Sequence, residues 1–223
     1  MRTDDLLGRP LALVIALALV SLLPFVFMSV TSFVKISTVL QIVRSAIGAQ
    51  NVPSNTVVMA LAAALTLIAM YPVGVKIADR AAPLFAKETP DTVTMVREGT
   101  EAVREPMRDF LKANASEREI ARFLEVARNA RAPAERSQVQ PTDLTVLVPA
   151  FVVTELTEAF AIGFLIYLPF LVIDMVVANV LLALGMQMLN PTQVSLPFKL
   201  LLFVAIDGWG LLAQSLVSGY QTG

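Results

Sequence analysis

Apolar and polar positions divide the chain into two apolar outer parts and one polar middle part. Residues 10–34 and 56–75 carry no charged side chain, and two further apolar segments, residues 144–184 and 194–214, follow the polar part. About 20 apolar residues suffice for a helix to cross a membrane. The pattern therefore predicts an all-α membrane protein. We expect about four apolar helical segments, paired as helical hairpins around a helical polar insert.

Three regions follow from this pattern. Residues 1–75 are predicted to form an N-terminal apolar helical hairpin, residues 76–143 the polar helical insert, and residues 144–223 a C-terminal apolar helical hairpin. The insert holds 24 of the 35 charged residues, 12 of them basic and 12 acidic. Its apolar residues recur at helical spacing, and Ser116 and Glu119 form a capping-box pattern. We therefore expect short amphipathic helices in the insert rather than a disordered spacer.

The first apolar run predicts a helix that stays part of the protein. Residues 10–34 are longer than the usual apolar core of a signal peptide, and no small-x-small cleavage pattern closes the run. A proline inside a helix removes a backbone hydrogen bond. We therefore expect this helix to bend at Pro24.

Residues 31–47 change from uniformly apolar to amphipathic, with Lys35 and Gln41 on the polar side of the helix. Two interpretations remain open: a helix that leaves the membrane with a solvated face, or a polar stripe that faces other subunits or a channel. Lys35 and Arg44 are the only charges in this connection. The positive-inside rule then places the connection in the cytoplasm and the insert on the periplasmic side.

The composition supports a membrane protein and excludes several function classes. The chain is 56% hydrophobic and 16% charged, with a mean hydropathy of +0.70, whereas soluble domains are about 25% charged. A net charge of −1 argues against nucleic acid as a partner. The chain has no Cys, no His and no phosphate-binding Gly-Lys motif. We therefore expect no enzymatic activity, no cofactor and no metal, and an enzyme using carboxylate, Lys, Ser or Tyr chemistry is a poor third alternative.

The second apolar part contains charged residues that lipid would not tolerate. A charge at the bilayer centre costs about 2.5–3.5 kcal/mol even on the mildest scale. Five such residues occur, namely Glu155, Glu158, Asp174, Lys199 and Asp207. Glu155 and Glu158 stand three apart and share a helical face. We hypothesise that they pair between subunits with Lys35, Arg44 or Lys199; the rival interpretation is a proton relay in a secondary transporter or ion channel, although the chain has no obvious internal repeat.

A short loop bounded by Gly185 and Pro191 separates the two apolar segments of the C-terminal region. It contains Met186, Gln187 and Met188. Methionine is unbranched and flexible and repacks around unlike partners, and an apolar constriction can stop ions by dewetting. The alternative is that both methionines fill a core or face lipid.

Three further positions in this region predict changes of chain direction. Gly163 and Pro169 are expected to bend the first apolar segment, and Gly185 to end it. If so, the apolar segments are hairpins packed inside an assembly rather than four straight membrane spans.

Several segments of the chain resemble the FliP/SctR family of type III export-apparatus membrane proteins. The resemblance covers nearly the whole chain. The amino-acid sequences of Phe33–Ile36 and Pro53–Asn55 favour the virulence-type branch, used by injectisomes, over the flagellar branch. The segments that carry the resemblance are Thr31–Ile36, Arg44–Gln50, Pro53–Asn55, Leu147–Leu156, Ala159–Phe164, Pro169–Val177, Ser195–Phe203 and Asp207–Trp209.

The resemblance implies a component of the protein export gate in the bacterial inner membrane. Family members assemble as a helical homo-pentameric ring with S-type and T-type subunits, next to other export-gate and needle or rod components. The ring surrounds the path of unfolded secreted proteins. A methionine-rich loop forms the gasket that closes the pore, which maps onto Met186, Gln187 and Met188. The family often has a third methionine where this chain has Gln187.

Overall fold

The computed structural model describes residues 4–49, 52–85, 92–186 and 188–221, and every regular element in these ranges is a helix. The all-α prediction is therefore confirmed for this part of the chain. In order, the elements are α1 (Asp4–Val30), α2 (Phe33–Ile47), α3 (Asn55–Phe85), α4 (Thr92–Asn114), α5 (Glu117–Asn129), the 3-10 turn η1 (Pro133–Gln138), α6 (Leu144–Ala183), α7 (Pro191–Ala205) and α8 (Gly208–Ser218).

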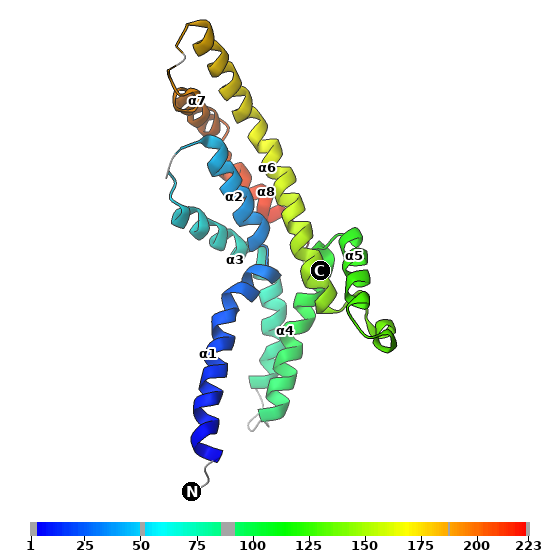
Figure 1. Cartoon of the computed structure of the whole chain (residues 1–223). Helices are drawn as coiled ribbons and strands as arrows, with labels where there is room; N and C mark the ends of the chain where they lie inside the picture. The colour runs from blue at the N-terminus through cyan, green and yellow to red at the C-terminus, as the bar shows by residue number, and fades with distance from the viewer. Residues whose placement is uncertain (1–3, 50–51, 86–91, 187, 222–223) are drawn as a thin grey trace.

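The molecule is elongated, with the N-terminus and the α6–α7 loop at opposite ends (Figure 1). Helices α1 and α4 reach towards the N-terminal end, while α6 and α7 form a hairpin that reaches the other end. Helix α2 lies beside α6 in the middle, and α5 stands to one side.

The core is built around α2. Its apolar arc is fully buried at Ile36, Val39 and Val43, which recur at helical spacing, and it packs against α6 and α3. The polar side of α2 is not uniformly solvated. Lys35 is buried near its start, whereas Ser45 is exposed near its end. A helix with one solvated polar face is therefore an incomplete description of α2.

Two helices, α3 and α6, are each long and apolar enough to cross a membrane. Two bent pairs pass the same test together: residues 20–30 with α2, which meet at 74°, and α7 with α8, which meet at 57°. These elements correspond to the four apolar segments that the sequence predicts. The boundary predicted between residues 75 and 76 falls inside α3, because the charges begin there while the helix continues to Phe85.

Three residues predicted to bend the chain, Pro24, Gly163 and Pro169, lie inside continuous helices. Helix α1 continues through Pro24, and the sharp change of direction lies at the break between α1 and α2. Helix α6 runs for 40 residues through Gly163 and Pro169 without ending at either residue, so bending at these two residues stays a prediction. Gly163 also permits close packing, since a Cβ atom there would lie 2.5 Å from Cδ1 of Ile42 on α2. Glycine marks both chain breaks and close helix contacts, and the sequence alone does not separate the two.

Candidate functional site

The loop between α6 and α7 has a defined geometry at both ends. Gly185 has a φ of +73°, a left-handed conformation that favours glycine. The backbone N–H of Met186 donates to the carbonyl of Leu181 at 2.9 Å, which closes the C-terminus of α6. Asn190 caps α7 by accepting the N–H of Thr192 at 3.0 Å. Gly185 and Pro191, the first residue of α7, thus bound the turn.

The two described methionines of this loop are both exposed, to different degrees. Met188 is 99% exposed and Met186 is 45% exposed, and Gln187 lies outside the described residues. The loop forms one extremity of the molecule (Figure 1). Met188 therefore makes almost no contact with the rest of this chain, whereas Met186 is partly covered by it.

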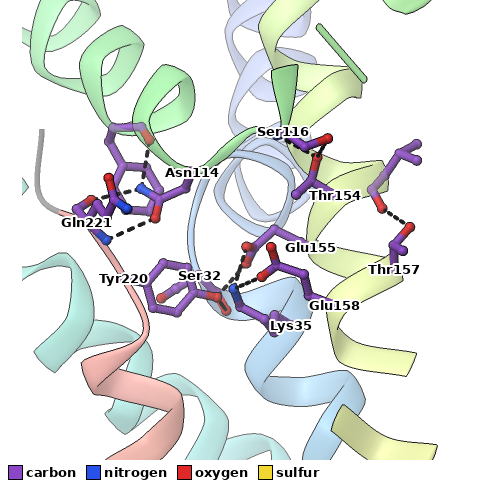
Figure 2. A network of polar contacts seen from close by, with 12 residues as sticks. Ser32, Lys35, Asn114, Ser116, Thr154, Glu155, Thr157, Glu158, Tyr220 and Gln221 are labelled. Carbon is purple, nitrogen blue, oxygen red and sulfur yellow. Dashed lines mark hydrogen bonds and ion pairs between the residues drawn. The ribbon is translucent and has the colours of Figure 1, made fainter. Parts of the chain in front are cut away.

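A first buried ionic network centres on Lys35 of α2. Its Nζ atom lies 2.7 Å from Oε2 of Glu158 and 2.9 Å from Oε1 of Glu155, both on α6 (Figure 2). The contact with Glu155 is ionic but lacks the alignment of a hydrogen bond. The Lys35 and Glu155 side chains are 7% and 0% exposed, whereas Glu158 is 51% exposed. The network therefore joins α2 to α6 in the interior and opens to the surface at Glu158.

Tyr220, after the end of α8, completes this network. Its hydroxyl donates to Oε2 of Glu155 and also lies 3.2 Å from the carbonyl oxygen of Ser32. Lys35 Nζ lies 4.3 Å from the centre of the Tyr220 ring. Burial and, after it, the Glu155 charge raise the pKa of Tyr220. The hydroxyl therefore keeps its proton and remains a hydrogen-bond donor.

A second network centres on Lys199 of α7, whose side chain is 2% exposed. Its Nζ atom donates to Oδ2 of Asp174 on α6 at 2.6 Å and to the carbonyl oxygen of Ala46 at 3.1 Å. Ala46 lies in the last turn of α2, where carbonyl groups carry partial negative charge. The Ser195 hydroxyl donates to the other oxygen of Asp174. Lys199 thereby ties α7 to both α6 and α2.

These networks provide partners within one chain for groups that were hypothesised to pair between subunits. Lys35 reaches Glu158, 123 residues away, because α2 packs along α6. Lys199 reaches Asp174, 25 residues before it, because α7 packs against α6. Arg44 and Asp207 form no ion pair among the described residues, and Nε of Arg44 is buried without a hydrogen-bond acceptor. Asp207 has a φ of 51° at the bend between α7 and α8. The hypothesis of pairing between subunits therefore stays open for these two residues.

The sequence reasoning missed two residues of the networks. Ser195 stands four residues before Lys199 on α7, so helical spacing could have placed the two on one face. Tyr220 gave no such signal, because its partners Glu155 and Ser32 are 65 and 188 residues away. In the part of the chain that the structure describes, no group of three or more acidic side chains is arranged to hold a metal ion.

Comparison with known proteins identifies the family. The FliP family model matches residues 16–216. The chain belongs to the FliP family. Among its relatives are the hypersensitivity response secretion protein HrcR of Ralstonia nicotianae, 43% identical over 94% of this chain and 97% of the relative, and the Yop proteins translocation protein R of Yersinia pestis, 43% identical over 93% and 95%. The flagellar biosynthetic protein FliP of Caulobacter vibrioides is 41% identical over 96% of this chain and 78% of the relative.

Membership of the FliP family settles the general role of the chain. Its relatives are named for secretion, for translocation and for flagellar biosynthesis, so this is a membrane protein of the type III export apparatus. Identities of 43% and 41% are too similar to separate the virulence branch from the flagellar one.

Proposed function

We propose that this chain is a core subunit of the type III protein export gate. With further copies of itself and with S-type and T-type subunits, it forms the inner-membrane pore through which unfolded proteins are secreted. Family membership supports the export role. The main observation in support of the gate is the exposure of Met188, which the α6–α7 hairpin presents with 99% of its surface accessible.

The loop would act as the gasket of this pore. A seal for a passing polypeptide must exclude ions when idle and yield to side chains of every shape. Met186 and Met188 are apolar and flexible and therefore suit both demands. Gln187 would reduce the apolar character of the seal between them. Repetition of the loop around a ring would bring several copies to one axis.

The exposed surface of the chain supports assembly with other proteins. Its accessible area is 14471 Å² for a mass of 24.1 kDa, whereas a compact monomer of this mass exposes about 10,000 Å². Only 11% of the most apolar stretch of α6 is buried within the chain. Phe160, Phe164 and Leu165 on α6 are each more than 60% exposed. Such faces need lipid or neighbouring subunits to cover them.

We further infer that the insert lies on the periplasmic side of the inner membrane. The residues Phe33–Ile36 and Pro53–Asn55 favour an injectisome over a flagellum as the system. The orientation now depends on fewer charges than the sequence suggested. Lys35 is neutralised by two carboxylates inside the protein, so Arg44 alone remains as a cytoplasmic marker. The balanced charge of the insert fits a long translocated segment.

The proposed gate can be tested by co-expressing the chain with the small membrane proteins encoded beside its gene. Native mass spectrometry in mild detergent should show a pentamer carrying those partners. Replacing both Met186 and Met188 with Ser should then cause ion leakage across the inner membrane without loss of the pentamer. Met175→Ser is the matched control, because Met175 is 57% exposed on α6 but lies outside the loop. A monomer that transports a solute, or a pentamer with no leak in the double variant, would contradict the gate.

A further inference from the structure

The last described residues of the chain fold back onto the insert. Helix α8 ends at Ser218, and residues 219–221 continue towards the end of α4. The backbone N–H of Gln221 donates to Oδ1 of Asn114 at 3.0 Å, and Nδ2 of Asn114 donates to the carbonyl of Gln221 at 2.8 Å. This pair of hydrogen bonds joins residues 107 positions apart. It satisfies the backbone of the C-terminal segment much as a strand partner would.

Tyr220 is held between partners from every region of the molecule (Figure 2). Its ring stacks on Phe110 of α4, with centroids 6.0 Å apart and planes at 26°. The Lys35 ammonium lies 4.3 Å from the centre of the same ring. The hydroxyl reaches Glu155 on α6 and the carbonyl of Ser32 at the break between α1 and α2. One side chain therefore contacts the N-terminal hairpin, the insert and the C-terminal hairpin.

Removal of Tyr220 would leave Oε2 of Glu155 without its hydrogen-bond donor, while the ion pairs of Lys35 with Glu155 and Glu158 remain. Oε2 of Glu155 accepts its hydrogen bond from the Tyr220 hydroxyl, and the other oxygen makes only the ionic contact with Lys35. A buried carboxylate that loses a donor bears its full desolvation cost. The charge-assisted bond and the cation–π contact thus act together against release of this segment.

We propose that residues 219–221 form a strap that fastens the C-terminal hairpin to the insert, and that Tyr220 is the positioning residue that holds Glu155 towards Lys35. The strap is a property of the folded chain. Its consequence for the gate rests on the proposed function. Helix α7 begins at the methionine loop and α8 ends at the strap, so the strap fixes the end of the hairpin that lies farthest from the loop along the chain. Release of the strap frees α8 to move and disturbs the seal.

The strap can be tested by hydrogen exchange and mass spectrometry on the full chain in its detergent-extracted complex. Tyr220→Phe removes the hydroxyl and keeps the ring, and Asn114→Ala removes the backbone partner of Gln221. Each substitution should raise the amide exchange rate about tenfold in residues 110–116 and 219–221. This is the increase expected when one charge-assisted or paired hydrogen bond is lost. Tyr71→Phe is the matched control, because Tyr71 is 71% exposed on α3. Unchanged exchange in both variants would overturn the strap.

A double-variant cycle separates positioning from general packing. If Tyr220 acts through Glu155, Tyr220→Phe should lower the thermal midpoint of the complex much less in a Glu155→Gln background than in the wild type. Equal lowering in both backgrounds would overturn the positioning role. If Glu155→Gln does not fold, the exchange of Asn114→Ala still decides the strap.

Two further outcomes distinguish the strap itself from its proposed effect on the gate. Ion leakage should rise in Tyr220→Phe and not in Tyr71→Phe. Raised exchange without leakage would overturn the coupling to the gate while the strap stands. Failure of the wild-type chain to assemble with its partners would overturn the proposed function, and the exchange measurement on the chain alone would still test the strap.

Discussion

Lys199 shows how a single buried charge can hold three helices. The ammonium lies between the Asp174 carboxylate and the carbonyl end of α2, and both contacts are within 3.1 Å. An ion withdrawn from water in this way contributes little net stability while paired. Loss of one partner is costly, because the other charge then stays buried without compensation. The value of the pair lies in fixing where α7 meets α6 and α2.

We expect Lys199→Met to lower the free energy of unfolding by about 3 kcal/mol. This is the lower end of the range for breaking a buried ion pair, because the Asp174 side chain is 26% exposed. Thermal unfolding in mild detergent measures this change. Arg80→Met is the control, since it breaks an exposed pair with Glu105 and should cost at most about 1 kcal/mol. Equal losses in the two variants would show that the Lys199 network does not organise the fold.

The sequence indicated the charged residues of both networks but not Ser195 or Tyr220. Charges inside apolar segments stand out, so Lys35, Glu155 and Lys199 could be singled out by composition alone. Their partners could not be assigned, because pairing depends on how α2 lies along α6. Tyr220 escaped notice, since a tyrosine in an apolar sequence is unremarkable until its position in space is known.

Among the elements, the contact between α2 and α6 positions both networks. Gly163 allows α6 to approach α2 at the height of Ile42, where a side chain would collide with it. The sequence predicted a bend at this glycine and did not indicate its packing role, because close packing and chain bending both favour glycine. The two ends of the methionine loop were predictable, since a glycine after a helix and a proline at the start of the next are strong local signals.

We expect Gly163→Ala to destabilise the chain by about 1–3 kcal/mol, because its Cβ would lie 2.5 Å from Cδ1 and 2.9 Å from Cγ2 of Ile42. Ile42→Val removes the nearer atom and should restore part of the loss. Gly74→Ala on α3 is the control: no atom lies within 4 Å of its added Cβ, so the change should be neutral or stabilise by up to about 1 kcal/mol. Thermal unfolding of the three variants tests the contact, and a destabilised Gly74→Ala would argue against a packing cause.

For the whole molecule, the sequence predicted the plan of the chain better than its packing. Charge distribution separates the insert from the apolar hairpins along the sequence, whereas α3 continues across the predicted boundary to Phe85. The path of α3 past residue 75, the lateral position of α5 and the return of residues 219–221 to α4 depend on contacts between distant residues. Such contacts leave no local pattern in one sequence.

We expect a lysine on the exposed face of α6 to disrupt assembly and leave the fold of the chain intact. Phe164 is 63% exposed, and a charge in an apolar contact costs about 2.5–3.5 kcal/mol. Phe164→Lys should therefore reduce the oligomer seen by native mass spectrometry, while helix content by circular dichroism stays unchanged. Glu125→Lys on the polar face of α5 is the control. An oligomer that forms equally well with Phe164→Lys would show that this face is not an assembly surface.

The length of α6 has a geometric consequence for how the protein meets the membrane. Forty residues of helix at about 1.5 Å per residue extend about 60 Å, twice the roughly 30 Å of hydrocarbon in a bilayer. To fit inside that layer, α6 would have to lean by about 60°, whereas membrane helices tilt by about 0–40°. Lipid can therefore cover only part of this rod, and the remainder must meet water or protein, including the helices α2, α4 and α5 that pack against it.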